Sequence, residues 1–293
     1  MSETTTSLLH KIESASDLHA VVRTMKAVAA SSVGQYENAV RSLDDYYHTV
    51  RLGLVACFRD PSVRSVEPNR WEKGVRVAIV FGSDQGLVGQ FNDVMVDFVL
   101  TTLADLPGEK VVWVVGERVA SRFEDTSLVV SEHFPLPNSI QAISPLIGGI
   151  LTELETRRER NEIAEIYLFH NRPIGSIYTP VSQRLLPLDE TWNRDFLSIP
   201  WPTNLPPEVM NGTKPTLLAL IREYLFVSLF RACAESLASE NASRLAAMQR
   251  AEKNIDGLIE DMQHTYHRLR KGKIDEELFD LISGFESIGG GTR

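Results

Sequence analysis

The sequence predicts an α/β fold in two parts: a long antiparallel two-helix coiled coil formed by the N- and C-terminal segments, and a central doubly wound α/β domain. All fourteen prolines lie from Pro61 to Pro215. Because proline breaks helix interiors, the two ends are free to form very long helices. Both ends carry a heptad-like apolar spacing, and the middle alternates β-rich runs with helical segments. We expect one helix at residues 1–60, the domain with its loops at 61–213, a second helix at 214–288 and a flexible tail at 289–293.

Residues 7–58 carry a heptad pattern: the positions expected to face a partner helix, called the seam, recur at alternating steps of three and four residues. This period of 3.5 predicts a left-handed supercoil against a partner helix. His19 and Lys26 are polar breaks in the seam, and such breaks either set the register or meet something outside the pair. The seam consists of Ile12, Ala15, His19, Val22, Lys26, Ala29, Val33, Tyr36, Val40, Leu43, Tyr47, Val50, Leu54 and Cys57.

The last helix repeats this rhythm. Its early part is rich in Ala and Ser between Ala232 and Ala247, and such small side chains let helices approach closely. The spacing shifts near Gly272. The seam consists of Leu245, Met248, Glu252, Ile255, Ile259, Met262, Tyr266 and Leu269, and it resumes at Ile274, Leu278, Leu281, Phe285 and Ile288.

The two helices differ in length. At a rise of ~1.5 Å per residue, the C-terminal helix would reach roughly 110 Å and the N-terminal helix ~75 Å. An intramolecular antiparallel pair would therefore leave one end of the C-terminal helix projecting alone. A coiled coil between two chains fits the pattern equally well.

The middle of the chain predicts a mostly parallel sheet, because strands and helices alternate along it. We expect strands at residues 75–81, 111–115, 127–133 and 163–170, and helices at 92–106 and 139–160. Residues 171–188 extend the β structure, and residues 188–215 are loop-like with several prolines.

The Gly-rich segment at residues 82–92 follows a strand and precedes a helix, as phosphate-binding loops do. Its spacing is G-x-x-x-G-x-x-G, which is neither G-x-G-x-x-G nor a P-loop followed by Lys-Ser/Thr. We therefore interpret it as a tight structural turn with close packing.

Composition excludes several classes of protein. The net charge of -9 provides no whole-chain basic field for nucleic acid. Cys57 and Cys233 show no metal or disulfide spacing, and a reducing compartment is the simple interpretation. We expect neither a signal peptide nor a transmembrane helix. We also expect no catalytic site, no metal and no cofactor; His264 and His267, three residues apart, are interpreted as a solvated helix face.

Charged and apolar side chains follow one another near the C-terminus. The basic side chains Arg268, Arg270, Lys271 and Lys273 precede the acidic run Asp275, Glu276 and Glu277. They are either a solvated face or a charged collar that meets a surrounding partner. The following residues Leu278, Leu281, Ile282, Phe285 and Ile288 form an apolar helix end, which needs a partner or its own domain to cover it.

Several segments resemble the gamma subunit of the F-type ATP synthases, in the family's order and over nearly the whole chain. Residues 236–248 (SLASENASRLAAM) carry the most specific match. Further matches are residues 24–31 (TMKAVAAS), 83–92 (SDQGLVGQFN), 184–188 (RLLPL) and 276–284 (EELFDLISG).

The resemblance implies a rotary shaft without catalytic residues, held inside three alpha and three beta subunits. Its base would rest on the c ring with the epsilon subunit, at the cytoplasmic face of the bacterial plasma membrane. The residues implied to meet the alpha and beta subunits are Met25, Lys26, Arg268, Arg270, Lys271, Lys273, Asp275 and Glu277. The bearing tip would be Leu278, Leu281, Ile282, Phe285 and Ile288, and the foot on the c ring would be Phe196, Leu197, Ser198 and Ile199.

Some positions depart from the family pattern, and they suggest a divergent or alternate bacterial complex. In the collar, Arg270 and Glu277 match while Lys271 and Asp275 depart, so we expect the contacts with beta to be rewired as ion pairs. Val88 and Gln90 depart in the Gly-rich loop, and the foot lacks the usual tyrosines and acidic residue. The transported ion, proton or sodium, is not specified by this chain.

Two alternatives remain. One is a nucleotide-binding enzyme, such as an oxidoreductase, with a coiled-coil oligomerisation arm, which would bind nucleotide stoichiometrically. The other is a coiled-coil scaffold without a rotary role, which would not co-purify with three alpha and three beta subunits.

Overall fold

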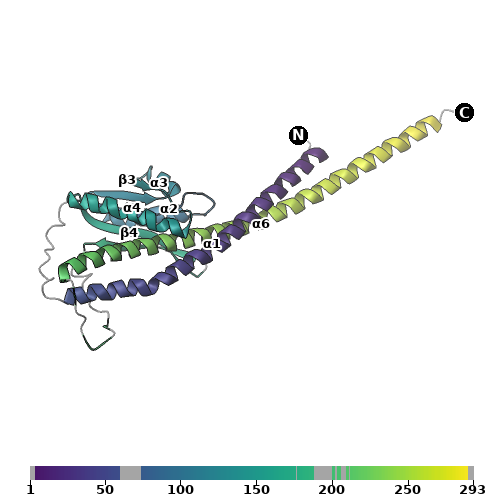
Figure 1. Cartoon of the computed structure of the whole chain (residues 1–293). Coiled ribbons are helices and arrows are strands. Elements are labelled where there is room, and N and C mark those ends of the chain that lie inside the picture. The colour runs from purple at the N-terminus through teal and green to yellow at the C-terminus, as the bar shows by residue number, and fades with distance from the viewer. Residues whose placement is uncertain are drawn as a thin grey trace. The chain divides into compact units, whose positions relative to one another are not determined.

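The computed structural model describes residues 4–59, 74–175, 177–187, 200–201, 203–205, 209–210 and 212–289, and the side chains of 284–289 lie outside this set. The chain forms two compact units: Met1–Val28 with Leu245–Arg293, called the end unit below, and Ala29–Arg244, called the central unit. Two long helices, α1 (Thr5–Arg59) and α6 (Thr213–Gly289), contribute to both units (Figure 1). Both long helices were predicted from the sequence, and their bounds agree to within a few residues.

In each unit α1 and α6 run antiparallel. In the end unit, Lys26 pairs with Glu252, and His19, which precedes Lys26, pairs with Asp256, which follows Glu252. In the central unit the Tyr47 ring stacks on the Tyr224 ring at 6.1 Å between centroids. The two helices therefore pair within one chain, which settles the choice that the heptad pattern left open.

All fourteen predicted seam positions of α1 are buried or half-buried, as are the eight predicted positions of α6 from Leu245 to Leu269. The seam also extends one turn further toward the N-terminus than predicted, because Leu8 is only 2% exposed. The spacing of apolar residues was thus sufficient to identify the buried face of α1 and of α6 up to Leu269, whereas the later seam positions Ile274, Leu278 and Leu281 are exposed.

The central unit holds a five-stranded sheet in the order β3-β2-β1-β4-β5. The first four strands of the chain are parallel to one another, and β5 is antiparallel to β4. The strands are β1 (Val75–Phe81), β2 (Lys110–Val115), β3 (Val129–Phe134), β4 (Ile163–Ile174) and β5 (Ile177–Leu186). The predicted β extension after residue 170 is confirmed as the end of β4 and the returning strand β5.

Helices cover both faces of this sheet, as a doubly wound fold requires. Helices α2 (Phe91–Ala104) and α3 (Glu117–Phe123) pack on one face, where Val80 and Val114 point. Helix α4 (Ile140–Glu159) packs on the other face with parts of α1 and α6, where Ile79 and Trp113 point. Alternate residues of each strand therefore enter two separate cores.

The expected strands and the helices α2 and α4 are confirmed, with boundary differences of a few residues. The short helix α3 was not predicted. Its seven residues span only two turns, which is too short for an apolar period to be recognised.

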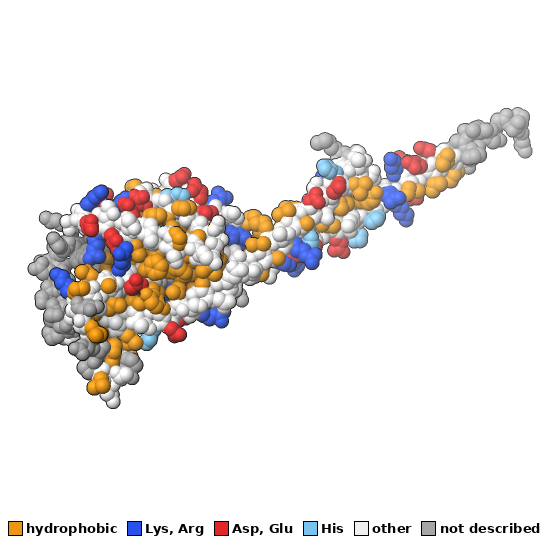
Figure 2. Space-filling model, in the orientation of Figure 1, with side chains coloured by type: hydrophobic (Ala, Val, Ile, Leu, Met, Phe, Trp, Pro, Cys, Tyr) orange, Lys and Arg blue, Asp and Glu red, His pale blue; other side chains and the backbone are white. Residues whose placement is uncertain are grey.

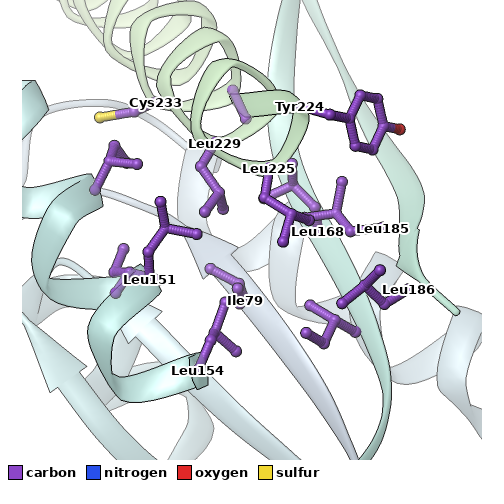
Figure 3. Packing of buried hydrophobic residues seen from close by; sticks show 14 of the residues in the cluster. Ile79, Leu151, Leu154, Leu168, Leu185, Leu186, Tyr224, Leu225, Leu229 and Cys233 are labelled. Atoms are coloured by element: carbon purple, nitrogen blue, oxygen red, sulfur yellow. The ribbon is translucent and has the colours of Figure 1, made fainter. Parts of the chain in front are cut away.

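Within the central unit α6 forms one wall of the larger core. Figure 3 shows Leu225 and Leu229 of α6 above Ile79 of β1, with Cys233 further along α6 and leucines of α4, β4 and β5 around them. Leu229 and Cys233 are fully buried. The N-terminal half of α6 therefore belongs to the core of the α/β domain and is also one half of the helix pair.

Within the end unit α6 continues past the first turn of α1. Thr5 lies fourteen residues before His19, so in an antiparallel pair it reaches about residue 270 of α6. Residues 271–283 are all exposed. The predicted projecting end of the C-terminal helix is thus present in this unit.

Candidate functional site

The loop after β1 lies where the winding of the sheet reverses, between β1 and β4. Open α/β sheets bind ligands in the crevice at such a point. Here the loop closes on itself: Asn92 accepts a hydrogen bond from the Ser83 amide at 3.1 Å and donates one to the Ser83 hydroxyl at 2.8 Å. Leu87 and Gly89 take positive φ values of 64° and 62°. The interpretation of this segment as a tight structural turn is confirmed.

The crevice beside this loop is occupied by α6. The Ser239 hydroxyl donates to the carbonyl of Asn171 on β4 at 3.0 Å, and the Ser243 hydroxyl donates to the carbonyl of Val88 in the loop at 2.6 Å. Ser236, Ser239, Glu240 and Asn241 are all less than 9% exposed. The small polar residues of α6 therefore satisfy backbone groups at the strand ends, where a nucleotide-binding domain would leave room for its ligand.

Glu235 of α6 is the centre of a buried ionic cluster. Its carboxylate accepts hydrogen bonds from Nε2 of His170 at 2.8 Å, from Nε of Arg172 at 2.9 Å and from Nε of Arg231 at 2.8 Å. Arg231 reaches Asp44 of α1 with its Nη1 atom at 3.1 Å. We call these five residues the Glu235 cluster; they join α1, α6 and β4.

The protonation states in the cluster follow from burial and geometry. Burial alone would disfavour the charged carboxylate, but the hydrogen bonds from His170 and the two arginines outweigh it and hold the pKa of Glu235 at about 2. Burial lowers the pKa of His170 in spite of its carboxylate partner. Its Nδ1 atom is buried without a hydrogen bond in the described part of the chain, which fits a neutral ring that donates through Nε2.

A second buried pair lies one turn further along α6. Glu240 is 3% exposed and accepts a hydrogen bond from Arg244 at 2.6 Å. Burial raises the pKa of Glu240 against the opposing effect of Arg244. These carboxylates interrupt the Ala- and Ser-rich run of α6, and that interruption was the only sequence signal that could have pointed to them.

The end unit contains Met25 and Lys26, two of the residues that the resemblance places near the catalytic subunits. Met25 packs against the small apolar cluster of Val22, Met248 and Ile255. Lys26 forms its ion pair with Glu252. Both polar breaks of the seam, His19 and Lys26, therefore meet acidic residues of α6.

The other predicted collar residues lie together on the exposed stretch of α6. Figure 2 shows these charges beside the apolar side chains that follow them toward the C-terminus. Leu278, Leu281 and Ile282 are 51%, 61% and 58% exposed, which is unusual for large apolar residues. The exposed charged residues are Arg268, Arg270, Lys271, Lys273, Asp275 and Glu277.

His264 and His267 are exposed, as expected of a solvated face. Among the described residues no group of His, Cys, Asp and Glu could hold a metal ion. Across the same part of the chain, no helix has the length and apolar character needed to cross a bilayer. The predicted foot (residues 196–199), the side chains of Phe285 and Ile288, and residues 290–293 lie outside the described residues.

A pair of long antiparallel helices, and an α/β domain whose crevice at the strand ends is filled by one of those helices, define the structural class of this chain. Comparison with known proteins agrees with this class. The family model described as ATP synthase matches residues 4–288. The chain belongs to the ATP synthase gamma-chain family, whose members are non-catalytic central-stalk subunits.

Individual relatives cover almost the whole chain. It is 27% identical over 285 residues to the ATP synthase gamma chain of Glaesserella parasuis, covering 95% of this chain and 97% of the relative. It is 25% identical over 290 residues to the gamma chain of Polynucleobacter asymbioticus, with the same coverage of both chains.

The fold is shared with solved mitochondrial ATP synthases. A chain of the Euglena gracilis OSCP/F1/c-ring structure matches with a TM-score of 0.65 and 18% identity, covering 98% of this chain and 95% of that chain. A chain of the Tetrahymena thermophila central stalk/c-ring structure matches with a TM-score of 0.57 and 19% identity, covering 79% and 99%.

Proposed function

We propose that this chain is the rotary shaft of an F-type ATP synthase or ATPase, which couples ion-driven rotation of a membrane c ring to the conformational cycle of the catalytic beta subunits. The observation that carries the proposal is the antiparallel pair of α1 and α6, whose α6 end continues alone with exposed charged and apolar side chains. Its partners would be three alpha and three beta subunits, the epsilon subunit and the c ring.

The proposed function assigns a role to each part of the chain. Residues 1–60 and 214–288 would form the shaft, residues 61–213 the central domain with the foot loops, and residues 289–293 a flexible tail. The protein would lie at the cytoplasmic face of the bacterial plasma membrane and be held there by the c ring through Phe196, Leu197, Ser198 and Ile199.

The exposed charges of α6 suit a contact that must be released at every step of rotation. Exposed ion pairs contribute only ~0–1 kcal/mol each. Arg268, Arg270, Lys271, Lys273, Asp275 and Glu277 would meet loops of the alpha and beta subunits in turn. Met25 and Lys26 would meet the same subunits at another level of the shaft, because Lys26 pairs with Glu252, which precedes Arg268 by more than four helical turns.

The apolar end of α6 would act as the bearing tip. Leu278, Leu281 and Ile282 are exposed in the chain by itself, and Phe285 and Ile288 continue the same spacing. An apolar sleeve formed by the alpha and beta subunits would cover them. Apolar contacts lack the directional preference of hydrogen bonds, so such a sleeve can hold the tip at all rotational angles.

Co-purification tests the proposal directly. When the chain is expressed with the alpha and beta subunits of its own organism, we expect one copy per three of each. A chain that remains separate from these subunits would contradict the shaft function. Stoichiometric nucleotide binding by the isolated chain would instead support the alternative of a nucleotide-binding enzyme with a coiled-coil arm.

A further inference from the structure

The Glu235 cluster connects three elements that are distant in sequence. Asp44 belongs to α1, Arg231 and Glu235 belong to α6, and His170 and Arg172 belong to β4. The cluster's two carboxylates and two guanidinium groups balance in charge, with His170 as a neutral donor. The carboxylate of Glu235 is only 3% exposed, whereas Arg172 and Asp44 are 47% and 52% exposed.

We propose that Glu235 is a positioning residue that clamps the paired helices to the sheet, so that torque passes between the α/β domain and the shaft without slip at this junction. The inference rests on the proposed rotary function. It goes beyond that function because it assigns the mechanical junction to one buried carboxylate and its cationic partners.

The geometry of the Glu235 cluster favours a link between elements over a contact within α6 alone. Arg231 lies one helical turn from Glu235 on α6, and its guanidinium also stands 5.7 Å from the centre of the Tyr47 ring on α1. The contact to β4 is held by two donors on one oxygen, and the contact to Arg231 uses the other oxygen. Both carboxylate oxygens are therefore fixed, and a rotation of α6 against the sheet would break hydrogen bonds to a carboxylate that is itself buried.

The surrounding contacts would not resist such a rotation equally well. The other polar bonds from α6 to the sheet and its loops are single hydroxyl or amide bonds, such as Ser239 to Asn171 and Gln183 to Tyr224. The ion pair between Arg222 of α6 and Glu155 of α4 is weak, because its side chains are 64% and 47% exposed. Much of the remaining contact is between apolar side chains, which resist separation more than sliding. The Glu235 cluster therefore contributes most of the resistance to rotation of α6 against the sheet.

The test uses the assembled complex reconstituted in vesicles, with Glu235→Gln in this chain. In this variant Arg231 retains its ion pair with Asp44, and the half-exposed Arg172 remains hydrated. Neither arginine is left as a buried unpaired charge, so the variant should fold. We expect the ratio of ATP-driven ion pumping to ATP hydrolysis to fall below that of the wild type. Hydrogen exchange of α6 amides near residue 235 should rise by at least about tenfold, because hydrogen bonds to a charged group are lost.

Glu165→Gln is the matched control. Glu165 also lies on the domain and is paired, but its partners are Arg76 of β1 and Tyr167 of β4. This variant should keep the wild-type pumping ratio even if it lowers stability. An assembled Glu235→Gln complex with the wild-type ratio and unchanged exchange would overturn the inference while leaving the rotary function intact.

Two milder variants cover a failure of Glu235→Gln to assemble. Arg172→Gln removes the half-exposed cation on β4, and Asp44→Asn removes the ion pair between Arg231 and α1. Each should lower the pumping ratio by a smaller amount. Wild-type ratios in both would overturn the inference, whereas absence of any complex with alpha and beta subunits for the wild-type chain would contradict the proposed function instead.

Discussion

Lys26 of α1 forms an ion pair with Glu252 of α6, although the two residues lie 226 positions apart in the chain. The hydrogen bond from Lys26 lowers the pKa of Glu252 below its usual range. Since lysine and glutamate occupy opposite positions of a largely apolar seam, the pair helps to fix which residues of the two helices meet.

Charge reversal at this pair tests the register of the helices. Lys26→Glu places two carboxylates opposite each other, and we expect it to lower the melting temperature of the end unit. Adding Glu252→Lys should restore most of the loss, because the pair is re-formed in the opposite sense. Thermal unfolding of the single and double variants measures this, and a double variant no more stable than Lys26→Glu would show that the pair does not set the register.

The buried histidine predicts a specific pH dependence of stability. Burial lowers the pKa of His170 below its ordinary 6.5, so the unfolded chain binds a proton that the folded chain does not. The free energy of unfolding should be highest above pH 6.5 and fall as the pH decreases below it. For one proton the slope is at most about 1.4 kcal/mol per pH unit.

His170→Gln should remove this contribution, which urea unfolding at a series of pH values can measure. His264→Gln is the control, because that side chain is 78% exposed. Equal slopes for the wild type and His170→Gln between about pH 5.5 and 7.5 would contradict the assignment; these limits lie about one unit on either side of the ordinary histidine pKa.

We expect any side chain at Gly82 to disturb the packing of the loop after β1 against α3. A Cβ atom at this position would collide with the Val119 side chain of α3. Gly82→Ala should therefore destabilise the central unit by about 1–3 kcal/mol.

Gly148→Ala provides the comparison for that variant. Nothing lies within 4 Å of a Cβ atom at residue 148, which is in helix α4. Alanine in a helix interior should stabilise by about 0.5–1 kcal/mol. Denaturant unfolding of both variants checks the pair of predictions, and equal effects would mean that the close approach of the loop to α3 is absent in solution.

Removal of residues 278–293 separates the roles of the two units. Residues 278–283 are exposed, so their loss should leave the unfolding transition of the central unit unchanged. If these residues form the bearing tip, the truncated chain should assemble poorly with alpha and beta subunits or couple ATP hydrolysis weakly to pumping. Unchanged assembly and coupling would count against the bearing role.

Much of the architecture could be predicted from the sequence because it depends on long periodic patterns. The confinement of prolines to the middle located both long helices, and the alternating three- and four-residue steps identified their buried faces. Alternation of strands and helices identified the doubly wound domain, while the short helix α3 had no pattern long enough to recognise.

The polar contacts of α6 could not be predicted in the same way. Ser239 belongs to a run of small residues on a paired helix, and Glu235 interrupts that run without indicating its partners. Their actual partners, Asn171, His170 and Arg172, lie on a strand more than sixty residues earlier. Only the folded sheet brings its strand ends against α6, so a single sequence does not reveal this contact.

Direct observation of rotation tests the central claim. With the alpha and beta subunits fixed to a surface and a probe attached to the central domain of this chain, ATP should drive the probe in one direction, with three equal steps in each turn. A probe that stays still, or moves without preferred direction, in complexes that hydrolyse ATP would contradict the account of this chain as the shaft.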